Sequence, residues 1–135
     1  MSEIREATVL FINDDIDEGK LLQIFLHNTR NDRVIVCDPK SQSLQAVVGE
    51  RPDLILIHAS SFAFDALQTY HQLRTMLEFE KTPVILWRTL KEPTEFYPVV
   101  QELGIAGCIP FVFDIEKDLL VARDIILSGG TYYPK

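Results

Sequence analysis

The sequence predicts an α/β domain whose parallel five-stranded sheet is covered by helices on both faces. Two kinds of segment alternate along its 135 residues. Short apolar runs rich in β-branched residues are typical of buried parallel strands, and the segments between them repeat apolar residues at the 3.6-residue period of a helix. Such alternation gives right-handed crossovers within one sheet. The length suits a single domain, 1–135, that buries about 70% of its unfolded surface.

Five apolar runs are expected to form the strands. Arg51-Pro52 and Thr82-Pro83 stand directly before two of these runs. Proline suits the start of a strand because no hydrogen-bonding N–H is needed there. In chain order the expected strands are 7–12, 33–37, 53–58, 83–87 and 107–109.

Five helical patterns separate and follow the runs. Gly104 and Gly129-Gly130 are expected to end helices, because glycine tolerates the left-handed conformation at that place. Asp114 is expected to cap the last helix. The apolar positions that share a helix face are Leu21, Leu22, Phe25 and Leu26, then Leu44, Val47 and Val48, then Ala66, Tyr70, Leu73 and Leu77, then Phe96, Val99, Val100 and Leu103, and finally Ile115, Leu119, Ala122 and Ile126.

The composition excludes several classes of function. Thirteen Lys and Arg stand against twenty Asp and Glu, so the net charge is −7. An acidic surface repels phosphate groups, and we therefore expect no direct binding of nucleic acid or membrane. The first ten residues lack the basic-then-apolar pattern of a secretion signal. Cys37 and Cys108 lie in apolar runs without metal spacing, which is typical of core residues in a cytoplasmic protein.

The residues at the carboxyl ends of the expected strands carry the chemistry, because ligand crevices in such sheets lie there. Polar and aromatic side chains follow four of the five runs. In chain order they are Asn13, Asp14 and Asp15, then His58, then Arg88 and Thr89, and then Phe111.

These segments, taken in order, resemble the receiver domain of bacterial two-component response regulators. VLFINDD is similar to the first strand of a receiver with its acidic pair, RPDLILIH to the third strand and TPVILW to the fourth. FAFDA stands where receivers have a Pro-Gly-x-Asp-Gly turn, and LGIAGCI with SGGTYYP resembles receivers that precede a helix-turn-helix output domain. The resemblance covers the whole chain. It implies a doubly wound (βα)5 flavodoxin-like receiver fold with strand order 2-1-3-4-5, and a role in phosphorelay signal transduction.

Most active residues of the family do not carry over, so the chain looks like an atypical pseudo-receiver. Only the acidic pair, Asp14 and Asp15, is kept. The family's other positions fall on His58 for the phosphoacceptor, Arg88 or Thr89 for the strand-four hydroxyl, Phe111 for the strand-five lysine and Cys108 for the aromatic switch.

This pocket predicts signalling without aspartyl phosphorylation. Phosphoryl transfer to a carboxylate uses Mg²⁺ to neutralise charge, and the ion needs several oxygen ligands. With two carboxylates left, we expect weak or absent Mg²⁺ binding, no cofactor and no catalytic residue. We hypothesise that His58 and Arg88 supply the positive charge instead, and that the acidic neighbours keep His58 protonated.

Other interpretations of the same residues stay open. An ordinary phosphorelay could use an unrecognised acceptor, but Asp53 lies roughly 16 Å from the strand end, and Asp65 is expected to face solvent. His58 could simply bond to neighbouring backbone, and the acidic pair could only cap a helix. A small-molecule sensor is another alternative, with an apolar crevice lined by Phe62, Phe64, Trp87 and Phe111.

The expected partner is a protein or a second copy, bound through the fourth helix, fifth strand and fifth helix, as the resemblance implies. A C-terminal output domain absent from this chain is a further possible partner. The tail 131–134 either packs back on the domain or begins a linker. The residues expected to be exposed on the contact face are Glu92, Glu95, Tyr97, Gln101, Glu102, Lys117, Asp118 and Arg123.

Overall fold

Five parallel strands form one sheet in the order β2-β1-β3-β4-β5. The computed structural model describes residues 5–58, 65–87, 96–109 and 114–133. This order and the parallel pairing confirm the predicted fold, and each strand lies within one residue of its expected run. The strands are β1 (Thr8–Asn13), β2 (Arg33–Cys37), β3 (Leu54–His58), β4 (Val84–Trp87) and β5 (Gly107–Ile109).

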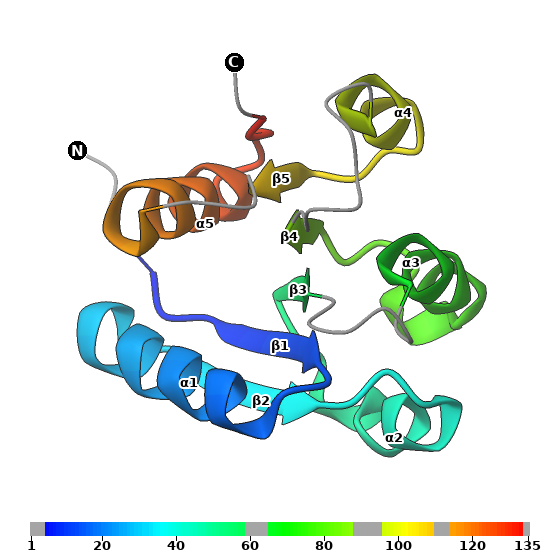
Figure 1. Ribbon diagram of the computed structural model, residues 1–135, viewed down its shortest axis with the longest axis horizontal. Coiled ribbons are helices and arrows are strands. Elements are labelled where there is room, and N and C mark those ends of the chain that lie inside the picture. Colours follow the sequence, from blue (N-terminus) through cyan, green and yellow to red (C-terminus); the bar gives the residue numbers. More distant parts are fainter. Residues whose placement is uncertain (1–4, 59–64, 88–95, 110–113, 134–135) are drawn as a thin grey trace.

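Helices cover both faces of the sheet, with α1 and α5 on one side and α2, α3 and α4 on the other (Figure 1). A π-helical turn, Ile115–Leu119, leads into α5, and 3₁₀ turns follow α2 and α3. The helices are α1 (Ile16–Arg30), α2 (Ser41–Ala46), α3 (Ala66–Thr75), α4 (Phe96–Glu102) and α5 (Leu120–Leu127).

Each face of the sheet has its own apolar core. Alternate residues of the strands point to opposite faces, so Leu10 and Ile12 pack under α2 and α3 while Val9 and Phe11 pack under α1 and α5. Strands buried on both faces explain why the apolar runs are continuous rather than alternating.

Three of the predicted helix faces are wrong in detail. Leu21 is 69% exposed, because α1 is rotated so that Gly19, Leu22 and Leu26 face the sheet. A Cβ on Gly19 would lie 2.5 Å from Val36 Cγ1, so the missing side chain lets α1 approach β2 at this point.

The other two errors concern α3 and α4. Leu77 is exposed because α3 ends before it, at an extended Met76. Val99 is exposed on α4, whose neighbour Val100 takes the buried position. Periodicity alone does not locate the end of α3, and it does not decide which of two adjacent valines on α4 is buried.

The predicted caps and stops are confirmed. Gly104 and Gly129 have φ values of 80° and 98°, the left-handed region that a glycine stop provides. Asp114 Oδ1 accepts a hydrogen bond from the backbone N–H of Lys117. Asp65 caps α3 by accepting from two backbone N–H groups and is exposed, as expected.

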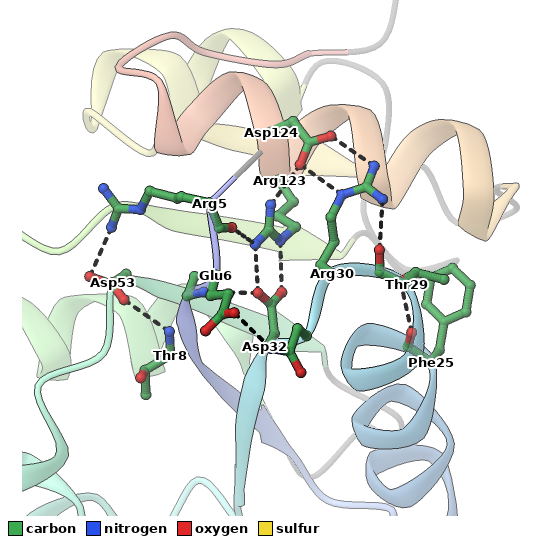
Figure 2. A network of polar contacts seen from close by, with 12 residues as sticks. Arg5, Glu6, Thr8, Phe25, Thr29, Arg30, Asp32, Asp53, Arg123 and Asp124 are labelled. Atoms are coloured by element: carbon green, nitrogen blue, oxygen red, sulfur yellow. Dashed lines mark hydrogen bonds and ion pairs between the residues drawn. The ribbon is translucent and has the colours of Figure 1, made fainter. Parts of the chain in front are cut away.

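A buried ion pair joins α5 to the start of β2, at the amino end of the sheet (Figure 2). Arg123 donates from Nε and Nη2 to the two carboxylate oxygens of Asp32, and from Nη2 to the carbonyl of Arg5. Asp32 also accepts from the N–H of Ala7. Arg123 was expected on the exposed contact face, and this is wrong: it is 1% exposed. Its guanidinium turns inward because buried acceptors surround it.

A second carboxylate extends this network toward the surface. Asp124 accepts from Nη1 of Arg123 and makes two hydrogen bonds with Arg30 at the end of α1. Burial acts to lower the pKa of Arg123, but the hydrogen bonds that Arg123 donates to Asp32 and Asp124 outweigh it and raise that pKa. The network therefore ties α1, α5 and the first residues of the chain together through charged groups.

Within residues 5–58, 65–87, 96–109 and 114–133, no helix is both long enough and apolar enough to cross a bilayer.

Candidate functional site

Three side chains line up at the carboxyl ends of the central strands. Asn13 on β1 lies opposite His58 on β3, and His58 lies opposite Trp87 on β4. They come from adjacent strands that end at the same edge, so the sequence prediction that His58 lies beside the acidic pair is correct in position. This edge is the candidate site.

Asn13 joins β1, β3 and α1 through its side-chain amide. Its Nδ2 donates to the carbonyl of His58 at 2.9 Å and to Oε1 of Glu18 at 3.0 Å. Its Oδ1 accepts from the N–H of Asp15 at 2.7 Å. The amide is buried, and these bonds fix how α1 leaves the sheet.

The ring of His58 is held on three sides. It stacks on Trp87, with ring centroids 3.6 Å apart. Its Nε2 lies 3.2 Å from Oε1 of Glu18, and its Nδ1 lies 3.5 Å from the carbonyl oxygen of Trp87. The side chain is 9% exposed. An imidazole in this position is part of the packing of the strand ends as well as of their polar network.

Burial lowers the pKa of His58 from 6.5 to about 4. The carbonyl of Trp87 and the charges of Asp14 and Asp15 act in the opposite direction, but they do not outweigh the loss of water. The expectation that acidic neighbours keep His58 protonated is therefore wrong, because desolvation is the larger effect. A pKa this low favours the uncharged ring at neutral pH, in close contact with the carboxylate of Glu18.

The acidic pair is exposed and is partly engaged by the helix. Asp15 caps α1, with Oδ1 accepting from the N–H groups of Asp17 and Glu18 at 3.0 and 3.3 Å. Asp14 is also exposed, and its charge reaches His58. The capping interpretation is correct for Asp15, and it is compatible with an electrostatic effect on the pocket.

The donor set at this edge bears on Mg²⁺, which binds proteins through several oxygen ligands. In the parts of the chain that the structure describes, no group of three or more His, Cys, Asp and Glu side chains is arranged to hold a metal ion. Where the resemblance implies a third carboxylate, the end of β3 carries the imidazole of His58. Arg88, Thr89 and Phe111, predicted to line the pocket, lie outside the described residues, as do Phe62 and Phe64.

Both cysteines are buried, and neither forms a disulfide. Cys108, which the resemblance assigns to the switch position, is in the core cluster beneath α3 and α4. Burial, followed by the charge of Asp38, raises the pKa of Cys37 to about 11. The interpretation of both residues as small core side chains is correct.

The expected contact face is exposed in part. Gln101, Glu102 and Lys117 are exposed, and Asp118 is half-buried. Glu92 and Glu95 lie outside the described residues, and so does the side chain of Tyr97.

The alternative acceptors are far from this edge or occupied by other contacts. Asp53 lies at the amino end of β3, where its carboxylate accepts from the N–H of Thr8 and pairs with Arg5. Asp65 is the cap of α3. Neither shares a contact with His58.

Sequence reasoning missed Glu18 as a member of the site. Glu18 stands three residues after the cap Asp15, in the first turn of α1, so its nearness along the chain to the acidic pair could have identified it. It also missed that Trp87 stacks on His58, which the register of adjacent strands could have suggested. The charge of the pocket is therefore more negative than the sequence indicated.

No family model and no curated protein matches the sequence. Among solved structures, the chain is similar to a two-component response regulator of the LuxR family from Aurantimonas sp. SI85-9A1, with a TM-score of 0.76 and 13% identity over 94% of this chain and 89% of that chain. For a LuxR family DNA-binding response regulator from Silicibacter pomeroyi the TM-score is 0.72 and the identity 22%, over 94% of this chain and 95% of that chain. For the non-phosphorylated receiver domain of RcsB from Escherichia coli the TM-score is 0.70 and the identity 15%, over 95% of this chain and 98% of that chain. These likenesses show that the chain has the receiver fold.

Proposed function

We propose that this chain is a cytoplasmic receiver-like signalling module that acts by protein–protein contact and without aspartyl phosphorylation. The observation that carries the proposal is the end of β3, where receivers form their acyl phosphate. There the chain has the imidazole of His58, buried against Trp87 and bonded to Glu18.

The chemistry of this edge argues against phosphoryl transfer. An acyl phosphate needs a carboxylate with a free oxygen beside a bound Mg²⁺. Around His58, Asp15 caps α1 and Glu18 contacts Asn13 and His58. Asp14 is exposed, so it is the carboxylate that a phosphorylation assay has to exclude. A phosphoryl group on the ring of His58 would have to replace one of its two ring-nitrogen contacts in a buried space.

A module of this kind signals through its surface. The receiver fold places α4, β5 and α5 side by side, and Gln101, Glu102 and Lys117 give this face exposed polar side chains. We propose that a protein partner or a second copy binds there. We propose no catalytic role for the module, no cofactor and no direct binding to nucleic acid.

Incubation with acetyl phosphate and Mg²⁺, followed by intact-protein mass spectrometry, tests the proposal. We expect no phosphoryl adduct on the wild-type protein. An NMR titration with Mg²⁺ provides the second measurement, and we expect no site-specific shift at Asp14, Asp15 or His58 below about 10 mM, where family-like carboxylate sites bind.

A variant set makes the result specific. Asp14→Asn and Asp15→Asn each remove one remaining carboxylate, and Asp65→Asn is a matched change at a helix cap away from the site. A single phosphoryl adduct on the wild type would overturn the proposal. Its loss in Asp14→Asn or Asp15→Asn would assign it to the pocket, and its loss in Asp65→Asn alone would identify Asp65 as the acceptor.

A further inference from the structure

Residues 131–133 run back along the outer edge of β5. The N–H of Tyr132 donates to the carbonyl of Ala106 at 3.0 Å, and the N–H of Cys108 donates to the carbonyl of Tyr132 at 2.9 Å. Tyr132 thereby forms a parallel bridge with Gly107. Figure 1 shows this C-terminal segment beside β5 after the end of α5. It takes up hydrogen-bonding groups that an edge strand otherwise leaves open.

Gly107 makes this close approach possible. A Cβ at this position would lie 2.7 Å from Cδ1 of Ile126 and 3.0 Å from the carbonyl oxygen of Tyr132. Glycine weakens a strand interior and often marks a place where another backbone approaches closely. The sequence of β5 is thus matched to a strand partner on its outer side.

Both tyrosine rings are also anchored. The hydroxyl of Tyr132 donates to Oδ1 of Asp118 at 2.8 Å, and the hydroxyl of Tyr133 donates to the carbonyl of Ile105. The two rings are half-buried, and they pack against different cores of the sheet. The edge of β5 therefore recognises two consecutive tyrosines, through backbone and side chains together.

Two glycines reverse the chain just before this segment. Gly129 has a φ of 98°, and the N–H of Gly130 donates to the carbonyl of Ile125 at 2.9 Å. A Cβ on Gly130 would lie 2.8 Å from Cγ2 of Ile125. The polar partners of Tyr132 and Tyr133 named above all precede this turn, at positions 105 to 118. A tail from another molecule could make the same contacts if the turn opened.

We propose that the outer edge of β5 is an interaction surface between two copies of this chain, in which residues 131–133 of each copy pair with β5 of the other. The occupant is a second copy because the edge already fits this segment at Gly107, Asp118 and Ile105. Exchange of identical segments is a low-cost route to a dimer, and a short turn before the segment is its usual hinge. This dimer goes beyond the proposed signalling function and is independent of whether the domain is phosphorylated.

The variant Gly129→Val tests the proposal in the full chain. A β-branched residue is strongly disfavoured at positive φ, so the closed turn is strained and the open form is not. We expect the association constant of the dimer, measured by sedimentation velocity, to be roughly thirtyfold higher than for wild type. Each dimer relieves two strained turns. Gly49→Val is the matched control, since Gly49 is exposed, has no positive φ and has nothing within 4 Å of an added Cβ.

A mixed sample of isotope-labelled and unlabelled chains shows which surface the dimer uses. In an exchanged dimer, isotope-filtered NMR detects contacts between Tyr132 of one chain and Gly107 of another, and adding Tyr132→Ala to Gly129→Val abolishes the dimer. A Gly129→Val protein that stays monomeric, or one whose dimer shows no such contact between chains, overturns the proposal. Protection of the β1 and β3 amides reports whether each variant is folded.

Discussion

The buried pair of Arg123 and Asp32 can be tested by replacing Arg123 with methionine, which keeps an unbranched stem and removes the charge. In Arg123→Met, the buried carboxylate of Asp32 keeps the N–H of Ala7 and loses both hydrogen bonds from the guanidinium. Removing one partner of a buried pair costs about 3–5 kcal/mol, because the other charge is left uncompensated. Folded domains of this size have about 5–15 kcal/mol in total.

Urea unfolding followed by far-UV circular dichroism measures the loss of stability. Arg33→Met is the matched control, because Arg33 pairs with Glu50 at the surface, where the two side chains are 59% and 39% exposed. An exposed pair contributes less than about 1 kcal/mol. We therefore expect a large shift in the urea midpoint for Arg123→Met and a small one for Arg33→Met.

The double variant Arg123→Met/Asp32→Asn separates lost packing from stranded charge. Asparagine keeps an acceptor for the N–H of Ala7 but carries no charge, so we expect the double variant to be more stable than Arg123→Met alone. The reasoning is refuted if Arg123→Met loses no more stability than Arg33→Met, or if the double variant is the less stable one.

Further predictions concern His58, Gly19 and Cys37. The folded pKa of His58, about 4, lies below the ordinary value of 6.5, so the folded state binds fewer protons between these values. The neutral His58 therefore contributes fully to the free energy of unfolding above pH 6.5. This contribution falls by about 3 kcal/mol as the pH drops to 4. The difference in urea midpoint between wild type and His58→Leu across that range measures it, and a constant difference would contradict the pKa. Gly19→Ala adds a methyl group 2.5 Å from Val36 Cγ1, so we expect the free energy of unfolding to fall by about 1–3 kcal/mol, measured by thermal unfolding. Gly19→Ala/Val36→Ala should recover stability, and no recovery would argue against the clash. Burial raises the pKa of the Cys37 thiol to about 11, so a thiol reagent at pH 8 should label the native protein far more slowly than the urea-unfolded one; equal rates would exclude this burial.

The fold was predictable because its signals are local and redundant. Each strand is a short apolar run, and the helices between them follow from spacing and from glycine stops such as Gly104 and Gly129. An error in one residue does not change this pattern. Leu21 was assigned to the wrong side of its helix, and the order of the strands was unaffected.

The site was predictable in position but not in charge. Sequence places His58 beside the acidic pair, since adjacent parallel strands end at one edge. The protonation of His58 depends on how much water reaches the ring, and that follows from its stacking on Trp87 and from the depth of the strand end. These are properties of the packed molecule.

Long-range polar contacts were the least predictable feature. Arg123 and Asp32 are 91 residues apart, and each is an ordinary charged residue in its own segment. Charged residues on a helix usually face solvent, and the pattern of α5 gave no reason to expect otherwise for Arg123. Only the meeting of α5 with the start of β2 creates the buried acceptors that turn it inward.

The contact between Trp87 and His58 also supplies an optical probe. Trp87 is the single tryptophan of the sequence, and its indole lies face to face with the imidazole. A protonated imidazole accepts an electron from an excited indole more readily than a neutral one does. The emission intensity of the unlabelled protein should therefore follow the ionisation of that one ring, and any binding event that separates the two rings should alter the fluorescence lifetime.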